Sequence, residues 1–513
     1  MAKKLKASKL KENKEKKNKI KVKVENTSKE TKTLDPRAAF YAKQLETVEK
    51  DLQLVSNSVV DPDRLSSGVL CIDYVFGGGF IGIGSLAGEE GSAKTTSVYH
   101  TLGVAKANLN LPYVGFYDAE GAISTKYSGN IWKPFGLEVK ELLSKKGRSQ
   151  GFYYYRDQVI ERMFDYLKKA LKMMPDKNWV EEANSWCYFF PKRDDHFKRL
   201  MEIMEVKPSN ALSTGAFYVV PTENSKPEGL FGVDSFASLL TREEEDKEDT
   251  GSVRSAMDAA AFAKHLKRVK IDAMEKKIVI LGTNHLGSHV RQQFGGPDEQ
   301  QYEKMGNALK YYSDQRARLY SRASSSATKL SSFFTYDKDN SKFGIEQSVE
   351  ANGSDRYAYK EIKNVKNKFG NPGLKTVFRV WVSDYRGKPR GIDPAFDVFV
   401  YLKTTNQLIN APKGKGKGYV FDLKPSIGKK KQGLLNSCKP FTFLTLKTLV
   451  IGEYTNNNSL IRKGLSEMGI DKKPNLRESL FKQLKEDDSL WSYETTESSK
   501  NDEEESEVDY EEL

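Results

Sequence analysis

Short apolar runs alternate with stretches of helical periodicity between residues 66 and 410. This alternation is typical of a mostly parallel sheet, because parallel strands are joined by crossovers that are usually helices. The sequence therefore predicts an α/β fold in which a central sheet is flanked by helices. The runs predicted as strands are 83–87, 114–118, 230–234, 278–283, 318–322 and 377–382.

The regions outside this pattern divide the chain further. Residues 1–34 carry a lysine every two or three positions and few apolar side chains, so we expect a disordered basic arm. Asp35 and Pro36 suit the start of a helix. The other predicted parts are an N-terminal helix and linker at 35–64, a candidate protomer contact; an inserted subdomain at about 144–228; a basic Gly/Lys linker at 413–435; a small C-terminal region at 436–490; and a disordered acidic tail at 491–513.

Composition narrows the setting. A chain of 513 residues suggests two or three domains. The net charge of +13 suits a polyanionic partner, although the charged ends are also compatible with tails that only keep the chain soluble. Cys71, Cys187 and Cys438 form neither a disulfide framework nor a C-x-x-C metal pair, so we expect a reducing cytoplasm. The sequence contains no run of about 18 apolar residues, so we expect no membrane span.

The segment GEEGSAKTT, residues 88–96, differs from the phosphate-binding loop G-x-x-x-x-G-K-[ST] at one position, Ala93. In such a loop the backbone N–H groups bind the β-phosphate, Lys94 neutralises charge and Thr95 holds Mg²⁺. We expect the loop to tolerate Ala93 if its φ is negative. A Gly/Ser-rich turn that happens to contain a lysine is the alternative. The predicted nucleotide contacts are Gly88, Glu89, Glu90, Gly91, Ser92, Ala93, Lys94, Thr95 and Thr96.

Two predicted strands end in acidic residues: Asp118 and Glu120 follow one, and Asp234 ends another. Ligands of open α/β sheets bind outside the carboxyl ends of the strands. Asp234 is therefore a candidate Mg²⁺ partner, direct or through water, beside Thr95. Asp118 or Glu120 is a candidate to orient and deprotonate an attacking water. Each acid alone also fits a hydrogen-bonded carboxylate at a strand end. The G-x-G-x-x-G pattern at 77–82 precedes no helix and is interpreted as a turn.

With these motifs the chain resembles the RecA-type recombinases, and phage-encoded members in particular, from about residue 65 to 410. The similarity is carried by LSSGVLCIDYVFGGGFIGIGSLAGEEGSAKTT, FYDAEGAISTKY, residues 280–319 and NVKNKFGNPG. It implies a RecA-like P-loop ATPase core over 65–412 that uses ATP and Mg²⁺. It also implies that Glu120 is the catalytic glutamate and that Tyr127 stacks on adenine. Some phage relatives also lack the second loop glycine.

The resemblance further implies that His285 senses the γ-phosphate and passes its state to a mobile DNA-binding loop. A lone histidine at a strand end would otherwise suit a structural role. Phe294 in that loop could stack on bases, worth roughly 1–3 kcal/mol each, or pack locally. A second DNA loop of the family falls on an acidic segment in which only Arg254 is usable. The predicted DNA contacts are Arg254, Arg291, Phe294, Lys304 and Lys310.

NVKNKFGNPG matches a family motif whose lysines reach the nucleotide of the neighbouring protomer, which assigns Lys366 and Lys368 to that role. Residues i and i+2 share one face of a strand, although a solvated strand edge is the simpler alternative. The resemblance thus implies a recombinase that forms filaments on single-stranded DNA and exchanges strands with a homologous duplex. A loader or single-strand-binding protein is a possible further partner. The expected location is the cytoplasm of a bacterium or of a phage's host.

Two other functions are compatible with the same residues. A ring-forming helicase shares the nucleotide-binding core but pulls on DNA strands. A DNA-binding accessory protein with a vestigial ATP site would explain Ala93 and the acidic candidate loop.

Overall fold

The computed structural model describes residues 64–174, 176–180, 185–190, 217–219, 227–245, 254–288, 301–322, 357–381, 391–416 and 418–487. The predicted basic arm, nearly all of the predicted N-terminal helix and linker, and the predicted acidic tail lie outside these residues, as do Arg291 and Phe294. In the described part of the chain, no helix is both long and apolar enough to cross a membrane.

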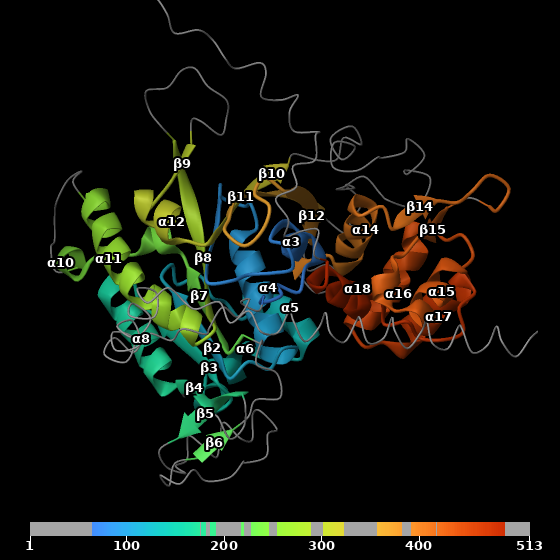
Figure 1. The fold of residues 1–513 in the computed structure, drawn as a ribbon. Helices are drawn as coiled ribbons and strands as arrows, with labels where there is room; N and C mark the ends of the chain where they lie inside the picture. The colour runs from blue at the N-terminus through green and yellow to red at the C-terminus, as the bar shows by residue number, and fades with distance from the viewer. Residues whose placement is uncertain are drawn as a thin grey trace, which may run out of the picture. The chain divides into compact units, whose positions relative to one another are not determined.

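A large α/β sheet forms the centre of the described structure (Figure 1). Its strand order is β13-β12-β11-β10-β1-β8-β7-β2-β3, and β9 pairs with β8. The parallel strands are β1 (Ile83–Gly88), β2 (Tyr113–Asp118), β3 (Phe152–Arg156), β7 (Gly229–Asp234), β8 (Ile278–Ser288) and β10 (Gln315–Arg322). The antiparallel strands are β9 (Gln301–Glu303), β11 (Tyr357–Asn367), β12 (Lys375–Trp381) and β13 (Gly391–Ile392).

Helices cover both faces of this sheet. Figure 1 shows α8 and α11 on one side and α4 and α5 on the other. Successive residues of a strand point to opposite faces, so Leu230 packs with the α4 side and Phe231 with the α8 and α11 side. The inner strands β1, β2 and β7 are buried at every position, as is usual for parallel strands. The helices of this region are α3 (Leu70–Val75), α4 (Lys94–Ala107), α5 (Tyr127–Trp132), α6 (Val139–Leu142), α7 (Lys145–Ser149), α8 (Ile160–Met173), α10 (Arg242–Glu245), α11 (Arg254–Glu275), α12 (Gly306–Tyr312) and α14 (Pro394–Thr404).

All six predicted strands lie in the sheet, and β8 and β10 are longer than predicted. The predicted insertion differs from the structure over its first part. β3 pairs with β2 and α8 packs in the core, so 144–174 belong to the central layer. A separate three-stranded sheet follows, made of β4 (Asp176–Val180), β5 (Ser185–Phe190) and β6 (Phe217–Val219).

The segment predicted as a basic linker, 413–435, is instead folded against the core. It holds β15 (Tyr419–Phe421), which pairs with β14 (Leu408–Asn410), and most of α15 (Lys429–Asn436). Tyr419 is fully buried, with its ring 5.6 Å from that of Phe399 on α14, which explains why the lysines around it do not free the segment. Three helices end the described chain: α16 (Phe443–Tyr454), α17 (Asn458–Met468) and α18 (Leu476–Lys485).

Candidate active site

The loop GEEGSAKT joins the end of β1 to the start of α4. Lys94, the first residue of α4, folds back over this loop: its ammonium donates to the carbonyls of Gly88 at 2.8 Å and Glu89 at 2.7 Å. Burial lowers the pKa of Lys94, and the nearby carboxylates of Asp234 and Glu120 oppose that effect. A side chain at Gly88 would lie 2.5 Å from the Leu319 carbonyl, so this position has room only for glycine.

Ala93 does not meet the condition set from the sequence. Its φ is 72° and its ψ is 23°, which is the left-handed conformation that glycine adopts in this kind of loop. For a residue with a β-carbon this conformation costs about 1–2 kcal/mol. The loop forms nonetheless, because Ser92 donates to the Glu89 carbonyl at 2.7 Å and Ser97 donates to the Ala93 carbonyl at 2.9 Å.

The parallel order of β1, β8, β7 and β2 brings four strand ends together beside the loop. Gly88 lies opposite His285, and Asp118 lies opposite Asp234. The two Mg²⁺ candidates are in contact, since Thr95 Oγ1 donates to Asp234 Oδ1 at 3.2 Å. Residues 139 positions apart in sequence are thus in contact at one edge of the sheet.

Asp234 has the features of a metal partner. Burial raises its pKa to about 6, against a hydrogen bond of 2.5 Å from Thr283 Oγ1. Its second oxygen, Oδ2, is buried and accepts no hydrogen bond from the described residues. Mg²⁺ commonly binds one or two carboxylates and completes its shell with phosphates and water. Among the described residues, no cluster of three or more His, Cys, Asp or Glu could hold a metal ion.

Asp118, the last residue of β2, and Glu120, two residues later, have different surroundings. Asp118 is buried and accepts hydrogen bonds from the N–H groups of Ala122 and Ile123 and from the Tyr154 hydroxyl. For Asp118 the structural alternative therefore holds. The side chain of Glu120 is 30% exposed and faces the space next to the loop, where a water could approach it.

Three side chains hold Glu120. Its Oε1 lies 2.8 Å from His285 Nε2 and accepts from the hydroxyls of Ser235 at 2.5 Å and Ser238 at 3.0 Å. The contact with His285, followed by the serine hydrogen bonds, lowers the pKa of Glu120 to about 2. The carboxylate is ionised at neutral pH, but it becomes an effective base only when some of these donors move away.

His285 links this carboxylate to a hairpin. Beyond His285, β8 continues and pairs with β9, and the N–H of Lys304 donates to the His285 carbonyl at 3.0 Å. The amide of Asn284 donates to the Lys304 carbonyl at 2.8 Å. Lys304 is exposed beside this hairpin, and Lys310 is exposed near the end of α12. The predicted DNA contacts Arg291 and Phe294 lie outside the described residues, and Arg254 is placed only as the first residue of α11.

Tyr127 begins α5 beside the first turn of α4. Its hydroxyl is hydrogen-bonded to that of Thr96, and its ring lies 6.1 Å from that of Tyr99. The hydroxyl of Tyr127 is thus engaged by α4, and its stacking on adenine stays a prediction.

Lys366 and Lys368 do not join this site within one chain. Lys366 lies opposite Arg316 near the start of β10, whereas Gly88 lies opposite Leu319. At about 3.3 Å per residue, this places the lysines roughly 10 Å or more from the loop. They lie at the opposite edge of the sheet, which is formed by the amino ends of the parallel strands.

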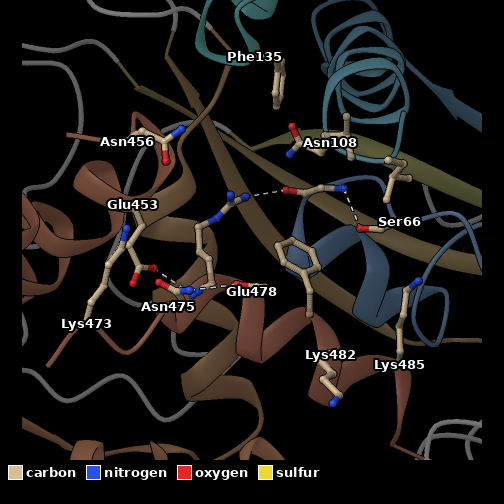
Figure 2. A pocket seen from close by; sticks show the side chains of 15 residues that line it. Ser66, Asn108, Phe135, Glu453, Asn456, Lys473, Asn475, Glu478, Lys482 and Lys485 are labelled. Carbon is tan, nitrogen blue, oxygen red and sulfur yellow. Dashed lines mark hydrogen bonds between the residues drawn. The ribbon is translucent and has the colours of Figure 1, made fainter. Parts of the chain in front are cut away.

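A cavity of about 450 Å³ lies at the far end of α4 and contains none of the predicted site residues (Figure 2). Its charged groups attach α18 to the core. Glu453 accepts the N–H groups of Leu476 and Arg477, and the Arg477 guanidinium donates to the Gly68 carbonyl at 2.8 Å. Arg477 also lies over the ring of Phe481.

Sequence reasoning missed the hydroxyls that hold the two acids, those of Ser235, Ser238 and Thr283. The available signal was the order D-S-x-x-S at the end of β7. Comparison with known proteins gives no assignment. No family model and no curated protein matches the chain. Function is therefore inferred from the site itself.

Proposed function

We propose that this chain is an ATP-dependent DNA recombinase with a RecA-like core, which forms filaments on single-stranded DNA and catalyses homologous pairing and strand exchange. One observation carries the proposal: five of the predicted site residues converge at the carboxyl edge of adjacent parallel strands. They are Lys94, Thr95, Glu120, Asp234 and His285. This is where nucleotides bind in open α/β sheets.

The loop and its lysine support triphosphate binding. The Lys94 ammonium, now bound to two loop carbonyls, is placed to transfer to a phosphate oxygen, where a charge-assisted contact would be stronger. The N-terminus of α4 adds its partial positive charge. Thr95 and Asp234 would hold Mg²⁺, which when bound neutralises phosphate charge and orients the phosphoryl group.

Glu120 is the group we propose to orient and deprotonate the attacking water. In the described state it is tied to His285 and two serines. A phosphate that drew His285 away would strengthen Glu120 as a base and would also move the start of the β8–β9 hairpin. The same histidine would thus report nucleotide to a DNA-binding segment. By linkage, DNA would then favour nucleotide binding to the same degree.

The position of Lys366 and Lys368 supports assembly of several copies. These lysines lie too far from the loop to serve their own chain's site, but they would reach a triphosphate on a neighbour stacked against this edge. In other NTPases, a positive charge inserted from a second protein stabilises the phosphoryl group during its transfer.

Electron microscopy with single-stranded DNA, with and without a non-hydrolysable ATP analogue, tests the assembly, and a strand-exchange assay with homologous duplex tests the reaction. We expect ATP-dependent filaments and homology-dependent exchange. Rings that unwind a forked duplex without homology would instead identify a helicase. DNA binding without DNA-stimulated hydrolysis would indicate an accessory protein, for which the strained Ala93 is the supporting observation.

A further inference from the structure

The edge of the sheet opposite the loop carries a charged cluster that the proposed function uses only in part. Lys270 on α11 and Lys368 just after β11 share one carboxylate, that of Asp314. The Asp314 side chain is only 2% exposed. Its Oδ2 accepts the N–H of Ile83 at 3.1 Å, and both lysines contact Oδ1.

The two lysines hold this oxygen unequally. Lys270 Nζ donates to Asp314 Oδ1 at 2.5 Å and to the Tyr312 carbonyl at 2.9 Å, and its side chain is 19% exposed. Lys368 Nζ lies 3.2 Å from the same Oδ1, and its side chain is 43% exposed. A buried carboxylate needs a partner, and Lys270 supplies one that is better ordered. Lys368 is therefore the cation that can leave.

Lys366, near the end of β11, also places its ammonium at this cluster, beside the C-terminus of α12. Its ammonium donates to the carbonyls of Lys310 at 2.6 Å and Tyr311 at 3.2 Å, next to the Tyr312 carbonyl that Lys270 holds. Cations at a helix C-terminus are favourable because they meet unpaired carbonyls. If Lys366 left these carbonyls for a phosphate, Lys270 would still hold the carbonyl of Tyr312, the last residue of α12.

We propose that Lys270 is a positioning residue: by holding Asp314 and the end of α12, it leaves Lys366 and Lys368 available for the triphosphate of a second copy of this chain. The inference rests on the proposed function and adds a residue that neither the phosphate-loop motif nor the NVKNKFGNPG segment contains.

The charges around Lys366 provide a readout that a purely structural role would not affect. Burial, together with the charges of Lys368, Arg316 and Lys270, lowers the pKa of Lys366 to about 8, and the Asp314 carboxylate opposes this shift. The ammonium is charged below this pH and loses its charge as the pH rises through about 8. Without the repulsion of Lys270, its titration should move to higher pH.

The test uses the full chain with Lys270→Met, and Lys267→Met as the matched control, since Lys267 is exposed on the same helix. In Lys270→Met, Lys368 is the lysine left to pair with the buried Asp314 carboxylate, so we expect it to stay bound there. The protein concentration for half-maximal DNA-dependent ATP hydrolysis should then rise about tenfold, as for one lost charged hydrogen bond. Lys270→Arg should restore it. Adding Asp314→Asn to Lys270→Met should release Lys368 and recover most of the loss, with melting temperatures recorded for every variant.

Acetylation of Lys366 as a function of pH, followed by mass spectrometry without nucleotide, measures the second effect. Its midpoint should lie higher in Lys270→Met than in the control. Normal assembly and an unchanged midpoint in Lys270→Met would overturn this inference alone. A wild-type chain without ATP-dependent assembly would overturn the proposed function and this inference together.

Discussion

The two edges of the central sheet satisfy their charges in opposite ways. At the carboxyl edge, Asp234 is buried with one oxygen that accepts no hydrogen bond from the described residues, and the Lys94 ammonium donates to two loop carbonyls. At the other edge, Lys270 and Lys368 share the Asp314 carboxylate, and Lys366 donates to two carbonyls of α12 nearby.

Under the proposed function, the carboxyl edge would bind a polyphosphate with its metal, and the lysines of the other edge would serve the site of a second copy. The difference between the two edges would then mean that the site of a single chain is incomplete. The predictions below test each edge separately.

The largest effect should come from removing the loop cation. Lys94→Ala leaves the phosphates without the charge that the loop supplies, and we expect ATP turnover to fall at least about 100-fold, as when one preorganised donor is lost. Steady-state hydrolysis with single-stranded DNA measures it. Lys140→Ala, an exposed lysine of α6, is the control. Normal turnover in Lys94→Ala would remove the phosphate-loop assignment.

The two acids after β2 should separate by the kind of damage they cause. Glu120→Gln should keep ATP and DNA binding but turn over about 10²–10⁴-fold more slowly, because a positioned base is lost. Asp118→Asn should instead lower stability by about 1–3 kcal/mol, since its buried hydrogen bonds are impaired. Single-turnover kinetics and thermal unfolding distinguish the two. If Asp118→Asn slowed the chemical step as much as Glu120→Gln, the assignment of the base to Glu120 would fail.

Asp234 predicts a pH-dependent need for magnesium. Its pKa is raised to about 6 by burial, so below that pH the carboxyl group is protonated and proton and metal compete for it. The Mg²⁺ concentration for half-maximal hydrolysis should rise roughly tenfold per pH unit below about 6 because of this one group. The titration of ATP itself is common to wild type and Asp234→Asn, and the difference in slope isolates the carboxyl group. Equal slopes would show that Asp234 does not hold the ion.

How much of this site follows from sequence depends on how local the signal is. The loop at 88–96 and the strand-end acid Asp234 were predicted because a motif or an apolar run ends directly at them. Residue type alone does not show which of Asp118 and Glu120 is the candidate base, because both are acids near the end of the same strand. They differ because the chain turns back on Asp118, so that N–H groups and a tyrosine of β3 saturate it.

The fold shows the same limit. The sequence predicts FYYYR as part of the inserted subdomain at about 144–228, and only its pairing with β2 puts β3 in the sheet. Lys270 and Asp314 are 44 positions apart and meet because α11 packs near the start of β10. No periodicity in the sequence encodes that contact, so the opposite edge could be predicted only as far as its NVKNKFGNPG segment.

The smallest effect concerns Ala93 and sharpens the comparison at the carboxyl edge. Its left-handed backbone costs about 1–2 kcal/mol for alanine, and glycine would remove that strain. Glycine also makes the unfolded chain more flexible, which offsets about 0.4–1 kcal/mol of the gain. Ala93→Gly should therefore raise the free energy of unfolding by up to about 1.5 kcal/mol, measured by denaturant unfolding with unchanged m-value. ATP affinity should stay equal or rise, because the loop already has the glycine-like shape. A loss of stability would mean that Ala93 contributes packing that outweighs its strain, and the loop would then be adapted to alanine rather than tolerating it.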